Sequence, residues 1–403
     1  MTDVGRIALI GGGIAAASAA EELRRQGFDG AITLLTRELD APYHRPPITK
    51  ALLSDPAHDV QFASPDWWSD HDIEVRTRSA VSALDVGAHV VTLTNKQTLD
   101  YDKALIATGA MVRRLAIEGS ALSGIHYLRT PANAHKLREE AAVAERIVLV
   151  GGSFIAVEVA ASMTAQGRQC TLVMQENLCL ERTFGPTVGT FVDELLRRRG
   201  VEIISRSDVA AFMGTDVLSG VRTAGGAEIP CELAVVGVGA VPDAKLATKA
   251  GLQIGESGGV RCDSQLRTSH PDVYAAGDVC EYYSVAHGRQ LRVEHERHAA
   301  AQGVTAAQNM IGAGRDHVEV PYFWTDIADW ARLEYVGAAR HWDEEVVTGS
   351  PEDGAFTVWY FDGGRLVAAL TNGRSDDLDL ARSILTAGPD DKVCARTLIG
   401  QTV

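Results

Sequence analysis

The sequence predicts an α/β protein with two doubly wound, Rossmann-like domains and a small C-terminal antiparallel α+β domain. Residues 6–35 and residues 147–174 each place an apolar run before a glycine-rich turn, a helix-like segment and a second apolar run. This order is typical of a βαβ unit, and two such units indicate two parallel sheets. Near the C-terminus, residues 356–370 form two β-rich runs about Asp362-Gly363-Gly364, which predicts a hairpin, and a helix-like segment follows at residues 378–385.

The composition is that of an ordinary globular protein. The chain has 403 residues, of which 46% are hydrophobic and 23% are charged, and its net charge of −15 gives no support to nucleic-acid binding. Its most apolar run, Ile147–Met163, contains Glu158 and two glycines, so no membrane span is expected. No signal peptide is recognisable, and no C-x-x-C pair occurs, which disfavours zinc or dithiol chemistry. We expect a cytoplasmic protein without a metal, whose cysteines are reduced: Cys170, Cys179, Cys231, Cys262, Cys280 and Cys394.

The first glycine turn fits the dinucleotide-binding pattern G-x-G-x-x-G/A. Gly11 permits the tight turn, Gly13 lets the backbone approach a pyrophosphate, and Ala16 allows close helix–strand packing. Glu38 follows the next apolar run, where an acid is expected to hold a ribose hydroxyl. The complete context predicts a dinucleotide site at residues 11–16, Gly11-Gly12-Gly13-Ile14-Ala15-Ala16.

The second glycine turn is less regular. Ser153 replaces the second glycine, and its Cβ would crowd a pyrophosphate although its hydroxyl could donate to it. Met174 ends the next run where an acid is usual, with Gln175 and Glu176 behind it, and no Arg follows directly to bind a 2′-phosphate. This pattern favours NADH and leaves NADPH open. The alternative is a degenerate βαβ unit that binds nothing at residues 151–156, Gly151-Gly152-Ser153-Phe154-Ile155-Ala156.

Three further segments fit a dinucleotide-binding protein. "ALIATGA" (104–110) is an apolar strand that runs into a Thr-Gly turn, and "DVYAAGDV" (272–279) ends in Gly277-Asp278, where the Asp can meet a ribityl or ribose hydroxyl. For Asp278 the alternative is a turn or a helix cap. "APYHRPPITK" (41–50) is an arm stiffened by three prolines and rich in cations, which by itself also fits a surface turn.

Together these segments resemble the FAD-dependent pyridine-nucleotide reductases of the glutathione-reductase structural class, and in particular the ferredoxin reductases that serve oxygenases. The matching stretches run in order from residue 6 to about residue 337 and include "GGGIAAASAA", "PYHRPPITK", "ALIATGA", "GGSFIAVEVAA", "VVGVGAVPD", "LRTSHPDVYAAGDV", "VEHERHAAAQG" and "VPYFWTDI". The resemblance implies an FAD-binding domain (1–112 and 240–318), an NAD(P)H-binding domain (113–239) and a C-terminal interface domain (319–403).

In this family the proline-rich arm lies over the flavin. The resemblance implies that Arg45 meets the FAD phosphates and that Lys50 lies at the reactive edge of the isoalloxazine, paired with Glu158. Cations there would stabilise the reduced, anionic ring, and the prolines would hold them in place. We expect Lys50 and Glu158 to be catalytic. The alternative for Glu158 is a solvent-facing position, which its apolar flanks Val157, Val159 and Ala160 disfavour.

The remaining carried-over residues form two sets. The FAD is expected to be lined by Gly11, Gly13, Ile14, Ala15, Ala16, Glu38, Arg45, Lys50, Val81, Ala107, Thr108, Gly109, Arg129, Gly277, Asp278, Glu294, His295, Glu296, Ala299 and Trp324. The nicotinamide nucleotide is expected to be lined by Gly151, Gly152, Ser153, Phe154, Ile155, Glu158, Gln175, Glu176, Gly237, Val238 and Gly239. Trp324 could instead be plain core and His295 a helix cap. Ser153, Met174 and Glu296 depart from the family pattern, and Glu296 would place a negative charge near the flavin.

The expected function is transfer of a hydride from NAD(P)H to FAD and then of single electrons to a [2Fe-2S] ferredoxin that serves an oxygenase. Two alternatives remain: an oxidase or quinone or dye reductase without a protein acceptor, and a redox-sensing flavoprotein of the apoptosis-inducing-factor type. The protein could be a monomer or a homodimer. The arm lacks the C-x4-C of disulfide reductases, which excludes their chemistry. Ferredoxin docking would need basic side chains, for which the candidates are Arg113, Arg114, Arg292, Arg297 and His298, unless these are solvated charges.

Overall fold

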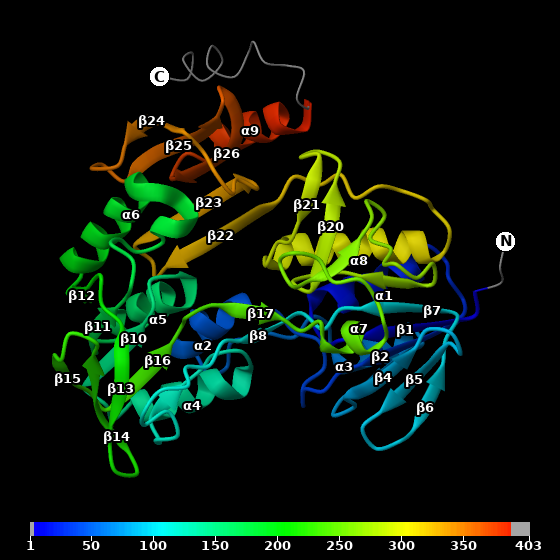
Figure 1. The fold of residues 1–403 in the computed structure, drawn as a ribbon, viewed down its shortest axis with the longest axis horizontal. Helices are drawn as coiled ribbons and strands as arrows, with labels where there is room; N and C mark the ends of the chain where they lie inside the picture. The colour runs from blue at the N-terminus through cyan, green and yellow to red at the C-terminus, as the bar shows by residue number, and fades with distance from the viewer. Residues whose placement is uncertain (1–3, 388–403) are drawn as a thin grey trace. The chain divides into compact units, whose positions relative to one another are not determined.

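The structure is a computed structural model that describes residues 4–387, and its chain divides into two compact units (Figure 1). The first unit comprises the chain up to His44, Asp59–Met111 and Val241–Phe323; the second comprises Arg45–His58, Val112–Ala240 and the chain from Trp324 onward. Strands β8 (Ala110–Val112) and β17 (Ala240–Pro242) carry the chain from one unit into the other. The three-domain division expected from the sequence stays a prediction.

A five-stranded parallel sheet forms the centre of the first unit. Its strand order is β19-β7-β1-β2-β3, with Ile7 of β1 opposite both Ile32 and Lys103. Four of the five residues in β1 and in β2 are buried apolar or small side chains, as expected for strands covered on both faces. The strands are β1 (Arg6–Ile10), β2 (Ala31–Leu35), β3 (Ile73–Arg76), β7 (Lys103–Ile106) and β19 (Val273–Ala275).

Helices α1 (Ile14–Arg25) and α8 (Glu296–Met310) pack against each other beside this sheet. The contact is close because α8 carries Gly303, where a Cβ would lie 2.1 Å from the Ala15 carbonyl oxygen. The unit also contains two three-stranded sheets and two short helices. These elements are β4 (Val81–Asp85), β5 (Val90–Leu93), β6 (Thr98–Asp100), β18 (Val260–Cys262), β20 (Cys280–Ser284), β21 (Arg289–Leu291), α3 (Pro65–Asp70) and α7 (Lys245–Lys249).

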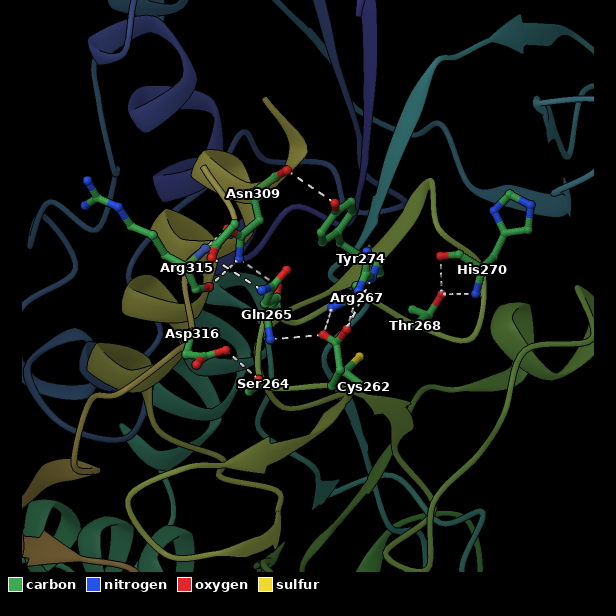
Figure 2. Close-up of polar contacts among 12 residues, drawn as sticks. Cys262, Ser264, Gln265, Arg267, Thr268, His270, Tyr274, Asn309, Arg315 and Asp316 are labelled. Atoms are coloured by element: carbon green, nitrogen blue, oxygen red, sulfur yellow. Dashed lines mark hydrogen bonds and ion pairs between the residues drawn. The ribbon is translucent and has the colours of Figure 1, made fainter. Parts of the chain in front are cut away.

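Polar contacts fix the end of α8 to the segment between β18 and β19 (Figure 2). The Asn309 side-chain amide donates to the carbonyls of Gln265 and Arg315 at 2.8 Å each, and its oxygen accepts from the Arg315 N–H at 2.7 Å. The Tyr274 hydroxyl donates to the Asn309 carbonyl at 3.2 Å. Because Tyr274 belongs to β19, these contacts hold the strand that leads to Gly277 against α8.

The second unit repeats the parallel arrangement. Its sheet has the order β12-β11-β10-β16-β9, and β10, β11 and α5 are the predicted second βαβ unit. The bounds are β9 (Ile125–His126), β10 (Arg146–Val150), β11 (Gln169–Val173), β12 (Glu202–Ile204), β16 (Leu233–Val236), α4 (Pro131–Ala141), α5 (Phe154–Ala165) and α6 (Glu181–Arg198). A three-stranded sheet and the proline-rich arm add β13 (Val209–Gly214), β14 (Leu218–Thr223), β15 (Glu228–Pro230), the 3₁₀ helix η1 (Pro46–Thr49) and α2 (Ala51–Ser54).

A five-stranded sheet of order β22-β23-β26-β25-β24 and helix α9 form the C-terminal part. The predicted hairpin is confirmed: β25 and β26 are antiparallel and turn at Gly363 and Gly364, whose φ values of +56° and +78° favour glycine. The bounds are β22 (Tyr322–Ile327), β23 (Ala331–Gly337), β24 (Glu344–Ser350), β25 (Ala355–Asp362), β26 (Arg365–Asn372) and α9 (Ser375–Ala387). The predicted fold class is confirmed; Cys394 lies outside the described residues.

None of the helices in residues 4–387 combines the length and the apolar character that crossing a bilayer would require.

Candidate functional site

The first glycine turn forms an open cradle at the start of α1. Gly11 has a φ of +136°, and a Cβ there would lie 2.0 Å from the Ala107 carbonyl oxygen, so only glycine fits. Gly13 is the N-cap of α1, and nothing lies within 4 Å of the place where its Cβ would be. Ile14 is the first residue of the helix, and Ala15 and Ala16 are buried beneath it. The open space therefore lies directly before the free N–H groups of a helix N-terminus.

A second helix N-terminus reaches the same place. Gly277 has a φ of +79°, and a Cβ on it would lie 3.3 Å from the Cβ of Ala15 and 3.5 Å from that of Ala299. Ala15 and Ala299 belong to the first turns of α1 and α8, so the N-termini of both helices lie beside the turn that carries Asp278. Helix N-termini attract anions. These residues fit the pyrophosphate of a dinucleotide such as FAD.

The other expected FAD residues of the first unit lie at strand ends. Glu38 follows β2, and its Oε2 accepts a hydrogen bond of 2.5 Å from the Tyr43 hydroxyl. Thr108 and Gly109 follow β7, and both form hydrogen bonds with Asp243. The Thr108 hydroxyl donates to the Asp243 carbonyl at 2.8 Å, and the Asp243 N–H donates to the Gly109 carbonyl at 2.8 Å. Val81 begins β4.

The segment that enters α8 contains three expected site residues. Glu294 forms an ion pair with Arg292. His295 occupies the N-cap position and stacks on Phe323, with ring centroids 3.6 Å apart, but its side chain makes no capping hydrogen bond. His295 is therefore the N-cap residue of α8 by position, as the alternative expected, but its ring does not cap the helix through a side-chain hydrogen bond.

Glu296 is paired with a histidine of the arm. Its Oε1 lies 2.7 Å from Nδ1 of His44, and the hydrogen bond to this carboxylate raises the pKa of His44 against the opposing effect of burial. The sequence indicated a negative charge here, and its partner was not predicted. The structure supplies a titratable cation, so the charge of the pair depends on pH.

The second glycine turn has nearly the same backbone as the first. Gly151 has a φ of +114°, and a Cβ on it would lie 2.3 Å from the Gly237 carbonyl oxygen. Ser153 has φ −103° and ψ −175°, close to the φ −90° and ψ 177° of Gly13. An L-residue adopts these angles without strain. Ser153 therefore preserves the turn, and its hydroxyl donates to the Gly237 carbonyl at 3.3 Å.

The loop after β16 lies against the start of α5. A Cβ on Gly237 would lie 3.0 Å from the Ala156 nitrogen and 3.3 Å from the Cβ of Ile155. Gly239 has a φ of +95° with open space beside it, and Val238 is half-buried between the two glycines. Phe154, the first residue of α5, contacts Phe184 edge to face at 5.7 Å. The backbone around this glycine turn is thus closely packed on one side.

The predicted ion pair of Lys50 and Glu158 is present in the second unit. The Lys50 Nζ lies 3.1 Å from the Glu158 Oε1, and both side chains are largely buried, with 16% and 9% of their surface exposed. Lys50 follows η1, and Glu158 lies in the second turn of α5. The alternative of a solvent-facing Glu158 is wrong, because the residue is only 7% exposed.

Two threonines complete the environment of this carboxylate. Thr49 donates to Glu158 Oε2 at 2.5 Å, and Thr325 of β22 donates to Oε1 at 2.6 Å. Asp326 lies 3.5 Å from the Lys50 Nζ. Buried charges are tolerated when paired and hydrogen-bonded. The arm and "FWTDI" were both noted in the sequence, but Thr49, Thr325 and Asp326 were not singled out, because nothing in a linear pattern joins them to Glu158.

Three other expected residues, Arg45, Arg129 and Trp324, lie in the second unit. Arg45 donates to the carbonyl of Arg129 at 2.7 Å, which fixes the guanidinium in the middle of the arm. Trp324 lies under the guanidinium of Arg332 at 5.3 Å and is only half-buried, so it is not plain core. Their contact with a flavin stays a prediction.

The candidate docking cations divide into exposed and buried side chains. Arg113 and Arg114 are exposed, and Arg297 is 54% exposed above the Tyr322 ring. Arg292 is 17% exposed and donates to the Asp278 carbonyl at 3.2 Å. His298 is fully buried, so its assignment to a docking surface is wrong. It lies on the core-facing side of α8, next to the exposed Arg297.

One group of potential metal ligands occurs among the described residues. Nitrogen and oxygen atoms of His89, His270 and Asp272 lie within 4.8 Å of one another. However, Lys103 Nζ lies 2.5 Å from Asp272 Oδ1, and the Asp272 N–H donates to His270 Nδ1 at 3.3 Å. A cation already neutralises the carboxylate and a ring nitrogen is engaged, so we do not assign a metal here. Figure 2 shows His270 with its contact to Thr268.

Comparison with known proteins gives matches over nearly the whole chain. Residues 5–303 match the family model described as pyridine nucleotide-disulphide oxidoreductase, and residues 322–399 match the model described as reductase C-terminal. The ferredoxin reductase subunit of 5,5'-dehydrodivanillate O-demethylase from a Sphingobium species is 35% identical over 94% of this chain and 93% of that protein. The ferredoxin–NAD(+) reductase component of the anthranilate 1,2-dioxygenase system of Burkholderia cepacia is 33% identical over 97% of both chains.

Among solved structures, the covalent complex of putidaredoxin reductase with putidaredoxin matches with a TM-score of 0.91 and 28% identity, over 98% of both chains.

Proposed function

The chain belongs to the pyridine nucleotide-disulphide oxidoreductase family and carries a reductase C-terminal domain, and from this we propose that it is an NAD(P)H-dependent ferredoxin reductase. In this function it takes a hydride from NAD(P)H onto FAD and delivers single electrons to a [2Fe-2S] ferredoxin that serves an oxygenase. FAD, when bound, supplies a centre that accepts two electrons together and releases them one at a time, as a hydride donor and an iron–sulfur acceptor require.

The FAD would be held through the cradle of the first unit. Gly11 and Gly13 leave room for phosphate oxygens at the N-terminus of α1, and α8 adds a second N-terminus beside Gly277. The residues fit an anion at this place because the backbone N–H groups there are donors without helical partners. Glu38 would then accept from a ribose hydroxyl, as its position after β2 favours.

The Lys50–Glu158 pair is the single observation that carries the proposed chemistry. Its burial and its two threonine donors keep a cation and an anion together at a fixed place in the second unit. With FAD bound, Lys50 would stabilise negative charge on the ring, and Glu158 would orient Lys50 and the incoming nicotinamide. The arm supplies no cysteine, and Cys170, Cys179, Cys231, Cys262 and Cys280 are all buried, so dithiol chemistry is not part of the proposal.

Anaerobic titration of the FAD-loaded protein with NADH tests the role of this pair. We expect Lys50→Met and Glu158→Gln to slow bleaching of the flavin about 100-fold to 1000-fold, because removal of one preorganised electrostatic group at a reacting centre costs on this scale. Lys136→Met is the matched control, since Lys136 is 66% exposed in the same unit. Flavin content per protein must remain unchanged. Unaltered reduction rates in both variants would rule out the assigned role.

The electron acceptor is tested separately by steady-state oxidation of NADH with and without a [2Fe-2S] ferredoxin. If the protein is a ferredoxin reductase, the rate of NADH oxidation will depend on the added ferredoxin. Fast turnover with oxygen or a quinone alone would instead favour a self-contained oxidase or quinone reductase. Very slow reoxidation with a change of oligomeric state would favour a redox sensor. A cytoplasmic location is part of the proposal, and the buried, free cysteines of the described residues are consistent with a reducing compartment.

A further inference from the structure

We propose that Glu176 binds the adenosine ribose of the nicotinamide nucleotide and selects NADH over NADPH, taking the role of the acid that is missing at Met174. This inference rests on the proposed function in that it assumes a nicotinamide nucleotide at the second glycine turn. Its support comes from a correspondence between the two βαβ units that becomes visible in their backbone contacts.

Met174 lies beneath the second glycine turn as Thr36 lies beneath the first. A Cβ on Gly152 would lie 2.7 Å from the Met174 sulfur, and in the first unit a Cβ on Gly12 would lie 2.3 Å from the Thr36 hydroxyl. Each side chain is the first after its strand, and each is nearly fully buried beneath the middle residue of its glycine turn. Met174 therefore occupies the same position as Thr36, and the first unit has no acid at that position either.

Glu176 corresponds in position to Glu38 of the first unit. Each acid is the third residue after its strand. The Glu38 carbonyl accepts from the Arg78 N–H at 2.9 Å, and the Glu176 carbonyl accepts from the Arg206 N–H at 3.0 Å. Both arginines have a left-handed backbone, with φ values of +53° and +52°. The two loops share one conformation.

The same correspondence holds one contact further along the chain. The Thr36 carbonyl accepts from the Ser79 N–H at 2.7 Å, and the Met174 carbonyl accepts from the Ser207 N–H at 2.8 Å. The acid therefore has the same position relative to its strand and its glycine turn in both units. The acid after the strand, at the position expected to hold the FAD ribose in the first unit, has its counterpart in Glu176 and not in Met174.

The Glu176 carboxylate is oriented toward the second glycine turn. Its Oε2 lies 3.3 Å from the place of a Cβ on Gly152, so the group lies against the glycine turn. Its Oε1 lies 2.9 Å from Nε of Arg182, and 17% of the side chain is exposed. Among the described residues no hydrogen bond engages Oε2, which leaves an acceptor for a ribose hydroxyl. The Leu180 N–H donates to the Gly152 carbonyl at 2.7 Å and holds the loop to the turn.

The chemistry of this arrangement discriminates between the two nucleotides. A carboxylate accepts hydrogen bonds from the 2′- and 3′-hydroxyls of NADH, whereas a 2′-phosphate would place a second anion beside it. Arg182 does not reverse this preference, because its guanidinium is paired with Glu176. The neighbouring Arg206 is engaged with Asn177, since its Nε donates to the Asn177 side chain at 3.0 Å. Once Glu176 is neutralised, Arg182 becomes available to a phosphate.

Binding of NAD⁺ and NADP⁺ to the FAD-loaded protein, measured by isothermal titration calorimetry, tests the inference without turnover. We expect the wild type to bind NAD⁺ more tightly. Glu176→Gln should weaken NAD⁺ binding about 10-fold to 100-fold, the range expected for hydrogen bonds to a charged group, and should strengthen NADP⁺ binding. In kinetics the KM for NADH should rise while kcat at saturation changes little. Glu194→Gln, an acid 60% exposed on α6, is the matched control and should change neither affinity.

An equal ratio of the two affinities in the wild type and in Glu176→Gln would overturn the inference. Arg182→Met provides a second readout, because it frees Glu176 and should leave the preference for NAD⁺ intact or increased. Loss of that preference in Arg182→Met would also contradict the assignment. A protein that discriminates through Glu176 but passes no electrons to ferredoxin would leave this inference standing and refute the proposed acceptor.

Discussion

A single carboxylate, Glu158, shows how much the environment of one residue depends on distant parts of the chain. It receives hydroxyl donors from Thr49 and Thr325, which lie 109 and 167 residues away in sequence, and an ammonium group from Lys50. Removing one partner of such a buried pair leaves an uncompensated charge, which costs about 3–5 kcal/mol. A contribution to stability does not by itself account for the pair, since apolar side chains of similar volume often stabilise a fold as well as a buried ion pair does.

A pH-dependent contribution to stability is expected at the pair of His44 and Glu296. The carboxylate raises the folded pKa of His44 above its ordinary value of 6.5. The stabilisation is then fully present below pH 6.5 and is lost as the pH rises through the folded pKa. Glu296→Gln should lower the pKa of His44, read from its imidazole proton shifts by NMR. It should also flatten the change in unfolding free energy between pH 6 and pH 9.

Replacement of His89 by Gln is the control for this measurement, because His89 is a half-buried histidine of the same unit that lies 3.4 Å from a different carboxylate, Asp272. That variant should keep the pH dependence due to His44. An unchanged His44 titration in Glu296→Gln would show that the pair does not form in solution.

At the scale of elements, the contact between α1 and α8 depends on the absence of a side chain at Gly303. Alanine is favoured over glycine in a helix by about 1 kcal/mol. A Cβ on Gly303, however, would lie 2.1 Å from the Ala15 carbonyl oxygen, a backbone atom that cannot move without shifting α1. Overpacking of this kind costs about 1–3 kcal/mol or more, so the clash outweighs the propensity.

We therefore expect Gly303→Ala to lower the midpoint of urea unfolding and to weaken FAD retention, because the N-termini of α1 and α8 would move apart. Gly87→Ala in the same unit is the matched control, since a Cβ there would lie 3.6 Å from its nearest neighbour, the Asp85 carboxylate. Retention of FAD and stability equal to the control would mean that the two helices tolerate separation.

The elements that the sequence predicts well are those with strict local requirements. The glycine turns at Gly11 and Gly151 and the hairpin at Gly363 were predictable because positive φ values and close backbone approaches admit few residues. The pairing of Lys50 with Glu158 followed only from family resemblance. The donors to Glu158 and the partner of Glu296 were not predictable, since tertiary packing alone brings them together.

The burial of His298 was missed for a related reason. Its neighbour Arg297 is exposed, and the polar residues His298 and Gln302 occupy positions on the buried side of α8 that a pattern of apolar residues does not reveal. The role proposed for Glu176 was missed because the dinucleotide-binding pattern was applied only to the position directly after the strand, where this chain has Met174. The proposal that the acid of this chain lies two residues later rests on the backbone contacts that Glu176 shares with Glu38.

At the scale of the whole molecule, the two units are expected to differ in their stability to acid. The first unit buries several histidines that remain neutral: burial lowers the pKa of His287 and of His317 to about 4, and that of His298 falls well below the ordinary value. In the second unit burial lowers the pKa of His126, but Glu140 at 2.8 Å opposes that shift. The unfolded first unit therefore binds more protons than the folded one between pH 6.5 and pH 4.

Each such histidine destabilises the first unit as the pH falls below 6.5, by about 2 kcal/mol at pH 5 for a folded pKa near 4. His44 does not offset this, because its contribution is already complete at pH 6.5. The lowered pKa values of Glu22, Glu74 and Asp102 act only below about pH 4.5, where these carboxylates begin to protonate. Hydrogen exchange at pH 5, compared with pH 7.5 after correction for intrinsic rates, should show greater opening in the first unit than in the second. FAD should be released in parallel with this opening. His317→Gln should reduce the difference between the two units. Equal opening of both units would show that these histidines titrate normally in the folded protein.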